Sequence, residues 1–439
     1  MRYGNFGRVL GIILAGGKGE RLMPLTKYRA KPAVHFAAKY RIIDFALSNL
    51  VNSGIFSIYV LVQFKSQSLN EHIERGWQFG GALRGRDFFI TLVPAQMWRG
   101  EHWFQGTADA VYQNLHLVTL YDADRVAIFA ADHVYKMDVE QMMAYHMDKK
   151  ADITVAANVV PTSEASAFGC IETDAGGRIT GFVEKPEIPP EIPGKPGLSY
   201  VSMGNYIFER EILEESLIED AALPTSHDFG RDIIPKLVPS SRVFAYDFST
   251  NELPGKDSSY WREDSPYWRD VGTIGAYWNA HMDLLQHDSE MTFFNPKWPI
   301  RTVSYADPPS YVCPVKGRSC SVQSTLAAEG SRVLGSTVES SVLSRNCVIM
   351  PGSSVEESII GEGVVVGENC RLKRVIIDSH NVIPPNTVLG CGENHCPDID
   401  DEQITVDPAS GIVVVGMPKM QLRKSMNIRK KGYDWSSFS

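Results

Sequence analysis

Residues 9–21 read VLGIILAGGKGER, in which a continuous apolar run, residues 9–14, leads directly into a glycine-rich turn. An unbroken apolar run of this length predicts a strand that is buried on both faces. Glycines let a backbone approach a ligand closely, and the N–H groups of such a turn can cradle phosphate oxygens. The spacing matches neither the dinucleotide fingerprint nor the P-loop, so the turn alone is equally compatible with a plain strand-to-helix connection.

The same alternation of short apolar runs and amphipathic stretches continues to about residue 290. It predicts further strands at 58–63, 125–130, 152–160 and 243–248, and helices at 42–52, 108–120 and 139–149. Residues 168–185 differ, because two β-like runs flank Asp174-Ala175-Gly176-Gly177 and predict a hairpin. The proline-rich segment 186–196 is either a surface connection or a lid near a site. The first part of the chain is therefore expected to be an α/β, Rossmann-like domain with a mainly parallel sheet.

A second proline-rich stretch divides the chain into a first domain (1–295), a linker (296–312) and a second domain (313–439). Reading in sixes from Ser340, the third position is apolar with one exception; it falls on Val342, Val348, Ser354, Ile360, Val366 and Leu372, then, after a five-residue step, on Ile377, Ile383 and Leu389. A six-residue period predicts a parallel β-helix, with an irregular β-sandwich as the alternative. The exposed ends of such a coil favour capping or self-association.

Composition and charge narrow the classes of function. The chain has 439 residues, 44% hydrophobic and 22% charged, as expected for a globular protein of more than one domain. Its net charge of −9 disfavours a general hold on nucleic acid or on an anionic membrane. Residues 1–41, however, carry nine basic side chains and one acidic one, a net +8 against −17 elsewhere. A bound small anion is the obvious reason.

Other classes lose support for lack of their motifs. Seven irregularly spaced cysteines do not suggest a disulfide framework, and Cys391 and Cys396 lack zinc-site spacing. No apolar run approaches the ~18 residues of a membrane span, and residues 9–15 lack a signal-peptide cleavage site. His-Glu-x-x-His, Gly-x-Ser-x-Gly and Cys-x-x-Cys are absent from the candidate sites. We therefore expect a cytoplasmic protein with reduced thiols.

Several charged residues lie where a parallel sheet would gather them. Lys18, Arg21, Arg29 and Lys31 surround the glycine turn, although a solvated basic surface would also explain them. Asp132 follows the run 125–130, at the carboxyl edge where ligand sites of open α/β sheets form. Its carboxylate suits Mg²⁺, or alternatively a helix N-cap.

Asp270 is the best candidate for a second metal carboxylate; an ion pair with Arg269 or a cap on the helix expected at 273–286 is the alternative. Lys185 ends the hairpin and suits a phosphate monoester, unless it is simply solvated. Gly106 opens a helix, where anions are favoured, although ordinary capping explains that motif nearly as well.

Together these residues resemble the sugar-nucleotide pyrophosphorylases, and within them the bacterial glucose-1-phosphate adenylyltransferases. The resemblance spans nearly the whole chain; its most specific stretches are Arg-Ala-Lys-Pro-Ala-Val-His (29–35), Arg-Ile-Ile-Asp-Phe-Ala-Leu-Ser-Asn (41–49) and Tyr-Trp-Arg-Asp-Val-Gly-Thr (267–273). It implies a nucleotidyltransferase domain at 1–295 and a left-handed β-helix at 313–439 for regulation and oligomerisation. It also implies transfer of the adenylyl group of ATP to α-D-glucose 1-phosphate, giving ADP-glucose and diphosphate for glycogen synthesis.

The resemblance also implies roles for individual residues. Asp132 and Asp270 would hold Mg²⁺, and Arg21 and Lys31 would contact ATP phosphates, with Asp132 also counted as catalytic. The substrate-binding residues would be Gly16, Gly17, Phe104, Gly106, Gly169, Glu184, Lys185, Ser202 and Asp228. Small anionic effectors would bind Arg29, His35, Arg41, Lys419 and Arg423, and the assembly would be a homotetramer.

Some positions depart from the family pattern. Ala131 stands for a usual glycine, Lys18 for an arginine and Phe104 for a tyrosine. Regulatory positions differ too: Tyr28, Leu120 and Ser379 replace a lysine of members activated by fructose 1,6-bisphosphate and two arginines of the nucleotide-inhibitor site. We therefore expect weak inhibition by AMP and a different activator. The alternatives are a uridylyl-, thymidylyl- or guanylyltransferase, a catalytically silent regulatory subunit, and an acyltransferase residing in the β-helix.

Overall fold

The structure is a computed structural model, and it describes residues 6–78, 87–98, 100–256, 267–286, 289–315, 317–392 and 403–418. The chain forms two compact units, Met1–Ala306 and Asp307–Ser439. The division falls inside the range 296–312. Part of that range packs on the first unit, because Trp298 is buried and the Arg301 N–H donates to Ser48 Oγ at 2.8 Å.

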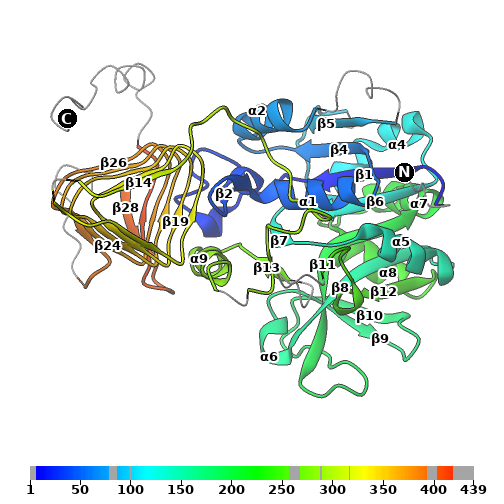
Figure 1. Cartoon of the computed structure of the whole chain (residues 1–439). Helices are drawn as coiled ribbons and strands as arrows, with labels where there is room; N and C mark the ends of the chain where they lie inside the picture. Colours follow the sequence, from blue (N-terminus) through cyan, green and yellow to red (C-terminus); the bar gives the residue numbers. More distant parts are fainter. Residues whose placement is uncertain are drawn as a thin grey trace. The chain divides into compact units, whose positions relative to one another are not determined.

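The first unit is built on a sheet of nine strands within the described residues (Figure 1). Strand β1 (Val9–Leu14) lies between β6 (Arg125–Ala130) and β4 (Ser57–Val62) and is parallel to both, and β5 (Phe89–Pro94) continues beyond β4. On the other side β11 (Leu198–Glu209) runs antiparallel to β6. The sheet ends in β8 (Ile153–Pro161), β12 (Val243–Asp247) and the expected hairpin, β9 (Gly169–Thr173) and β10 (Ile179–Glu184). It is therefore a mixed sheet with a parallel centre.

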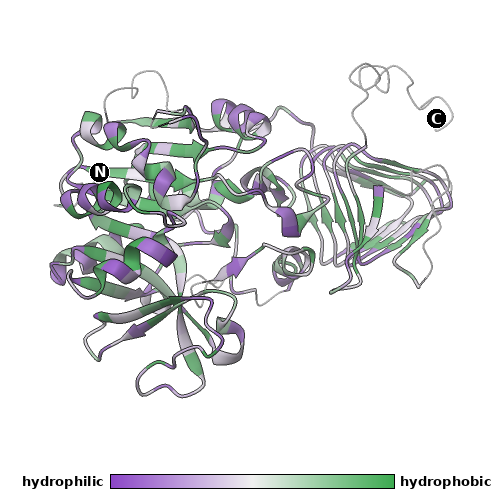
Figure 2. Ribbon diagram, turned by 180° about the vertical axis from the view of Figure 1, so that it is seen from behind, coloured by the Kyte–Doolittle hydropathy of each residue, from purple (hydrophilic) through white to green (hydrophobic). Residues whose placement is uncertain are grey.

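Burial on both faces explains the unbroken apolar strands, which Figure 2 shows as hydrophobic ribbons. Neighbouring residues of β1 enter opposite cores: Ile13 packs in one with α1 (Ile42–Asn52), α2 (Gln67–Gly76) and α5 (Val139–Asp148). Ile12 packs in the other with α3 (Thr107–Tyr112), α4 (Leu115–Tyr121), α7 (Arg210–Ala221) and α8 (Ile234–Leu237). The helix expected over 108–120 is thus two helices.

Short elements position side chains around the sheet. Two-residue strands β2 (His35–Phe36) and β3 (Tyr40–Arg41) form one hairpin, and β7 (His133–Tyr135) pairs antiparallel with β13 (Trp268–Asp270), just before α9 (Ile274–Asp283). The remaining helical turns of this unit are η1 (Glu20–Leu22), η2 (Lys31–Ala33), α6 (Thr162–Ala165), η4 (Phe229–Ile233) and η5 (Phe248–Thr250). None of the helices in the described ranges is long and apolar enough to cross a membrane.

The second unit is a parallel β-helix with three faces. The first face holds β14 (Tyr311–Cys313), β17 (Arg332–Leu334), β20 (Val348–Ile349), β23 (Val365–Val366) and β26 (Val382–Ile383). The second holds β15 (Ser321–Gln323), β18 (Thr337–Glu339), β21 (Ser354–Glu356), β24 (Arg371–Lys373) and β27 (Val388–Leu389). The third holds β16 (Leu326–Ala327), β19 (Val342–Leu343), β22 (Ile359–Ile360), β25 (Val375–Ile377), β29 (Val413–Val415) and an antiparallel β28 (Ile404–Val406).

The expected register of this coil is wrong at its first three positions. The hydrophobic core contains Leu343, Ile349 and Val355 rather than Val342, Val348 and Ser354. Ser354 pairs with Arg371 on the next coil, seventeen residues on, so each turn takes two steps of six and one of five. The five-residue step recurs from Val355 to Ile360 and from Leu372 to Ile377. A pattern with a single five-residue step puts the polar Ser354 in the core, whereas in the structure Val355 occupies that place.

Candidate active site

A pocket of about 920 Å³ opens at the carboxyl ends of β1 and β6. The two strands are in register to Leu14 and Ala130, so the glycine turn after β1 and Asp132 after β6 emerge side by side. The walls of the pocket include every residue that the sequence suggested for catalysis, for substrate binding or for metal binding: Gly16, Gly17, Arg21, Lys31, Phe104, Gly106, Asp132, Gly169, Glu184, Lys185, Ser202, Asp228 and Asp270.

The glycine turn faces open space. A Cβ added at Gly17 would meet no atom within 4 Å, and one at Gly16 would meet only Gln63 Cβ, at 3.8 Å. The lack of side chains there leaves room in the pocket. Gly19 adopts a left-handed φ of 66°, which lets the chain enter the short helix η1 that carries Arg21. A Cβ at Gly272 would lie 3.0 Å from Arg21 Nη2 and 2.9 Å from Asp270 Oδ1, so a side chain there would crowd both groups.

Two carboxylates meet at the base of the pocket. Lys31 Nζ donates to Asp132 Oδ2 at 3.1 Å and to Asp270 Oδ1 at 3.0 Å, and the lysine side chain is only 8% exposed. The β7–β13 ribbon makes this meeting possible, because it pairs Asp270 with His133, the residue after Asp132.

The alternative roles for the two aspartates do not hold. Thr273 caps α9, accepting the Ala276 N–H at 3.2 Å, and Arg269 pairs with Asp283 at 3.1 Å. Asp132 is followed by a strand, and the N-cap of the next helix is Asp138.

The electrostatics of this cluster follow from its geometry. Burial raises the pKa of Asp132, yet neighbouring His133 and Lys31 outweigh burial and hold that pKa well below its usual range. Burial likewise lowers the pKa of Lys31, but the carboxylates of Asp132 and Asp270 outweigh it, so the lysine pKa is raised. Asp132 and Lys31 are therefore both charged at neutral pH.

This donor set fits a divalent cation. Asp132, His133 and Asp270 each offer a ligand atom, and these atoms lie within 4.8 Å of one another. Two carboxylates on separate elements, beside a pocket, suit a hard cation that takes its remaining ligands from water or phosphate. One lysine compensates only half of the charge of the two carboxylates.

Residues of the β9–β10 hairpin and of β11 form one side of the pocket. A Cβ at Gly169 would lie 2.8 Å from Glu184 Oε2 and 2.9 Å from Phe182, so a larger residue would have to displace these two side chains. The Lys185 side chain is 55% exposed and its Nζ lies 3.5 Å from Glu184 Oε1. Ser202 lies where the pairing of β11 with β8 shifts register, and its Oγ accepts the Gly204 N–H at 3.2 Å. This side combines one cation with hydroxyl and carboxylate groups.

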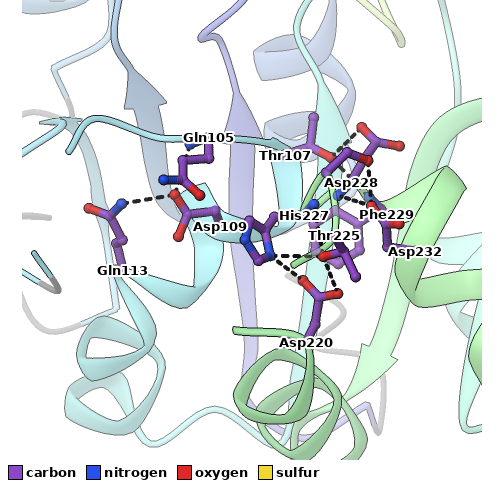
Figure 3. A network of polar contacts seen from close by, with 11 residues as sticks. Gln105, Thr107, Asp109, Gln113, Asp220, Thr225, His227, Asp228, Phe229 and Asp232 are labelled. Atoms are coloured by element: carbon purple, nitrogen blue, oxygen red, sulfur yellow. Dashed lines mark hydrogen bonds and ion pairs between the residues drawn. The ribbon is translucent and has the colours of Figure 1, made fainter. Parts of the chain in front are cut away.

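The facing side joins the start of α3 to the segment before η4 (Figure 3). Asp228 Oδ1 accepts the N–H groups of Gly230 and Arg231, and its Oδ2 accepts from Thr107 Oγ1 at 2.9 Å. Two N–H groups in the first turn of α3 are already used within the protein, because Ala108 and Asp109 donate to the His227 carbonyl. The expectation that this helix start attracts an anion is therefore not supported by its geometry.

Three of the five residues suggested for an effector lie together outside the pocket walls. His35 and Arg41 are cross-strand partners in the β2–β3 hairpin, and Arg29 Nη1 lies 3.2 Å from His35 Nδ1. Arg29 is buried, and Arg41 Nη1 donates to the Ser68 carbonyl at 2.7 Å. Lys419 and Arg423 lie outside the described residues.

Sequence reasoning missed several polar residues of the pocket. Gln63, Thr107, Tyr206, Ser226 and Arg231 line it as well. Thr107 follows Gly106 directly and Arg231 lies three residues after Asp228, so their closeness in sequence to two candidate residues could have indicated them. Gln63, just after β4, and Tyr206, in β11, reach the pocket because their strands lie beside β1 and β6 in the sheet, and this strand order is known only from the structure.

Known proteins match over almost the whole chain. Residues 10–287 match the family model described as nucleotidyl transferase, and residues 307–415 match that of the GlmU-like C-terminal hexapeptide. Glucose-1-phosphate adenylyltransferase of Deinococcus radiodurans is 48% identical over 93% of this chain and 98% of its own length. Glucose-1-phosphate adenylyltransferase 1 of Vibrio parahaemolyticus is 49% identical over 87% and 92%, and the enzyme of Photobacterium profundum is 46% identical over 93% and 98%.

Proposed function

This chain belongs to the glucose-1-phosphate adenylyltransferase family of nucleotidyl transferases, and from that premise we propose that it forms ADP-glucose and diphosphate from ATP and α-D-glucose 1-phosphate. One observation carries the proposal: two carboxylates and a buried lysine meet beside a glycine turn at the base of a large polar-lined pocket. The product would supply glucosyl units for glycogen.

In the proposed reaction a phosphate oxygen of glucose 1-phosphate attacks the α-phosphorus of ATP, and the bond to the leaving diphosphate breaks on the opposite side. No protein nucleophile is needed, so positioning and charge compensation carry the catalysis. Gly16 and Gly17 leave room for the triphosphate, and Arg21 and Lys31 neutralise its charge from one side of the pocket. Phe104 and Gly106 belong to the nucleotide side.

The sugar phosphate occupies the opposite side in this proposal. The exposed Lys185 binds its phosphate, Glu184 and Ser202 hold sugar hydroxyls, and Gly169 keeps space beside Glu184. Asp228 contributes less, because three protein donors already occupy its carboxylate.

We infer that the divalent cation of this site is Mg²⁺, held by Asp132 and Asp270. When bound, Mg²⁺ draws electron density from phosphate oxygens and so favours attack at phosphorus. Oxygen donors and neighbouring substrate phosphates favour Mg²⁺ over softer metals. Removal of divalent cations is expected to abolish turnover, and Mg²⁺ to restore it.

We further propose a cytoplasmic homotetramer, regulated by small anions at the cluster of Arg29, His35 and Arg41. The hairpin pairs His35 with Arg41, and Arg29 Nη1 lies 3.2 Å from His35 Nδ1, which supports a shared site.

The activity is tested by assaying purified protein with glucose 1-phosphate and each nucleoside triphosphate. The highest kcat/KM is expected with ATP. A clear preference for UTP, dTTP or GTP would refute the proposal in favour of another nucleotidyltransferase, and no activity with any triphosphate would favour the silent regulatory subunit.

A further inference from the structure

His227 holds an unusual backbone conformation next to the pocket without lining it. Its φ is 54°, in the left-handed region that glycine adopts readily and that asparagine, aspartate and histidine adopt more often than alanine and most other residues. The neighbours Ser226 and Asp228 line the pocket, whereas His227 does not. Its side chain is directed toward Asp220 of α7 and is 13% exposed (Figure 3).

A buried carboxylate holds that side chain (Figure 3). His227 Nδ1 lies 2.7 Å from Asp220 Oδ2, at the end of α7, and Asp220 is only 3% exposed. Since a carboxylate only accepts, Nδ1 carries the proton and donates it. The hydroxyl of Thr225 donates to Asp220 Oδ1 at 2.8 Å and accepts the backbone N–H of His227 at 3.2 Å, so it ties the carboxylate to the His227 backbone. The imidazole is thus fixed from a helix outside the pocket.

The backbone carbonyl of the same residue caps helix α3. Ala108 N–H and Asp109 N–H donate to the His227 oxygen at 2.8 and 3.3 Å. The N-cap residue, Gly106, has no side chain that could do this. A Cβ at position 106 would lie 2.2 Å from the His227 oxygen and 2.3 Å from the Ser226 oxygen, so the close approach itself requires glycine.

Thr107, the residue after Gly106, joins the same two segments by two further hydrogen bonds. Thr107 Oγ1 donates to Asp228 Oδ2 at 2.9 Å and accepts the Phe229 N–H at 3.0 Å. The start of α3 and the residues 226–229 therefore form a single continuous wall of the pocket. His227 lies at the centre of this wall and connects it to α7.

We propose that His227 is a positioning residue that sets the distance between Gly106, assigned to the nucleotide, and Asp228, assigned to the sugar, within this wall of the pocket. The His227 carbonyl fixes the start of α3 next to Gly106, and the left-handed φ of His227 sets the direction in which the chain continues to Asp228. Asp220 fixes the imidazole of His227 by a hydrogen bond from outside the pocket. The inference rests on the proposed function, because that function assigns Gly106 to the nucleotide and Asp228 to the sugar phosphate. It predicts that loosening His227 weakens binding of both substrates more than it slows the chemical step.

The test compares His227→Ala with His227→Asn in steady-state kinetics with ATP and glucose 1-phosphate. Alanine removes the donor to Asp220 and disfavours the left-handed backbone, so KM for each substrate is expected to rise about tenfold while kcat stays within about threefold. Asparagine tolerates this φ and offers an amide donor to Asp220, so both KM values are expected to stay within about twofold of wild type. Thr225→Val, which removes one hydroxyl, is expected to give an intermediate rise and serves if the alanine variant does not fold.

His146→Ala is the matched control. His146 is buried and also paired with a carboxylate, its Nε2 lying 3.1 Å from Glu209 Oε1, but its chain neighbours Tyr145 and Met147, unlike those of His227, do not line the pocket. This variant is expected to lower the melting temperature without changing either KM. Unchanged KM values in His227→Ala, a fall in kcat alone, or an equal KM rise in His146→Ala would overturn the positioning role. A wild-type protein that forms no ADP-glucose would instead overturn the proposed function.

Discussion

The buried histidine of α9, His281, is expected to make the stability of the first unit depend on pH. Its Nδ1–H donates to the Tyr277 carbonyl at 2.8 Å, and its Nε2 accepts the Ala37 N–H at 3.1 Å. Ala37 and Ala38 both have left-handed φ angles, 48° and 70°, at the turn of the β2–β3 hairpin. A protonated ring would present a second donor to the Ala37 N–H, so the hairpin turn depends on a neutral imidazole.

The magnitude follows from the shift in pKa. Burial lowers the pKa of His281 from 6.5 to about 4, so the unfolded chain binds a proton that the folded chain excludes. The stabilisation is present above pH 6.5 and is lost as the pH falls toward 4. At about 1.4 kcal/mol per pKa unit the whole effect is about 3 kcal/mol, of which about 2 kcal/mol is lost between pH 7 and pH 5.

His281→Gln isolates this effect, because its amide oxygen can accept the Ala37 N–H but does not titrate. Urea unfolding followed by tryptophan fluorescence reports on the first unit, since all tryptophans except Trp435 belong to it. The variant is expected to be less stable than wild type at pH 7, because it loses the bond to Tyr277 and the contact with the Phe36 ring. The difference between the two proteins should narrow by about 2 kcal/mol at pH 5. An identical difference at both pH values would refute a neutral, buried His281.

Two further predictions test the coil and the regulation. Val355→Asn is expected to cost the β-helix about 3 kcal/mol, because it places an amide in the apolar core, whereas Ser354→Asn should cost less than about 0.5 kcal/mol; equal thermal shifts would contradict the corrected register. AMP is expected to inhibit weakly, since Leu120 and Ser379 replace arginines of the family pattern; a dose–response curve with strong inhibition at low AMP would contradict this expectation.

Local patterns predicted much of the fold, because they act over short distances. The strand Val9–Leu14 and the helix Ile42–Asn52 have the expected bounds, since buried β and amphipathic helical periodicities are clear there. The long strand β11 was not predicted, because Gly204 and Asn205 interrupt its apolar residues. The register of the coil failed for a related reason: a five-residue step at each turn is visible only when successive coils stack.

Non-local contacts explain what sequence could not supply for the site. The carboxylates were recognisable from their motifs, but their joint contact with Lys31 depends on the β7–β13 pairing. The requirement for glycine at 106 comes from a carbonyl more than a hundred residues away. The left-handed His227 has no local sequence signal, because it is held by Asp220 and Thr225.

We propose that Asp132 and Asp270 together form the metal-dependent centre of adenylyl transfer. Asp132→Ala tests it most directly, by turnover of ATP and glucose 1-phosphate at saturating Mg²⁺, with circular dichroism as the check on folding. The variant is expected to fold and to lose at least about a hundredfold in kcat. Without Asp132 the site would no longer hold the cation whose positive charge offsets the negative charge on the phosphate oxygens in the transition state. A folded Asp132→Ala variant with wild-type turnover would show that Asp132 does not hold a metal needed for the reaction.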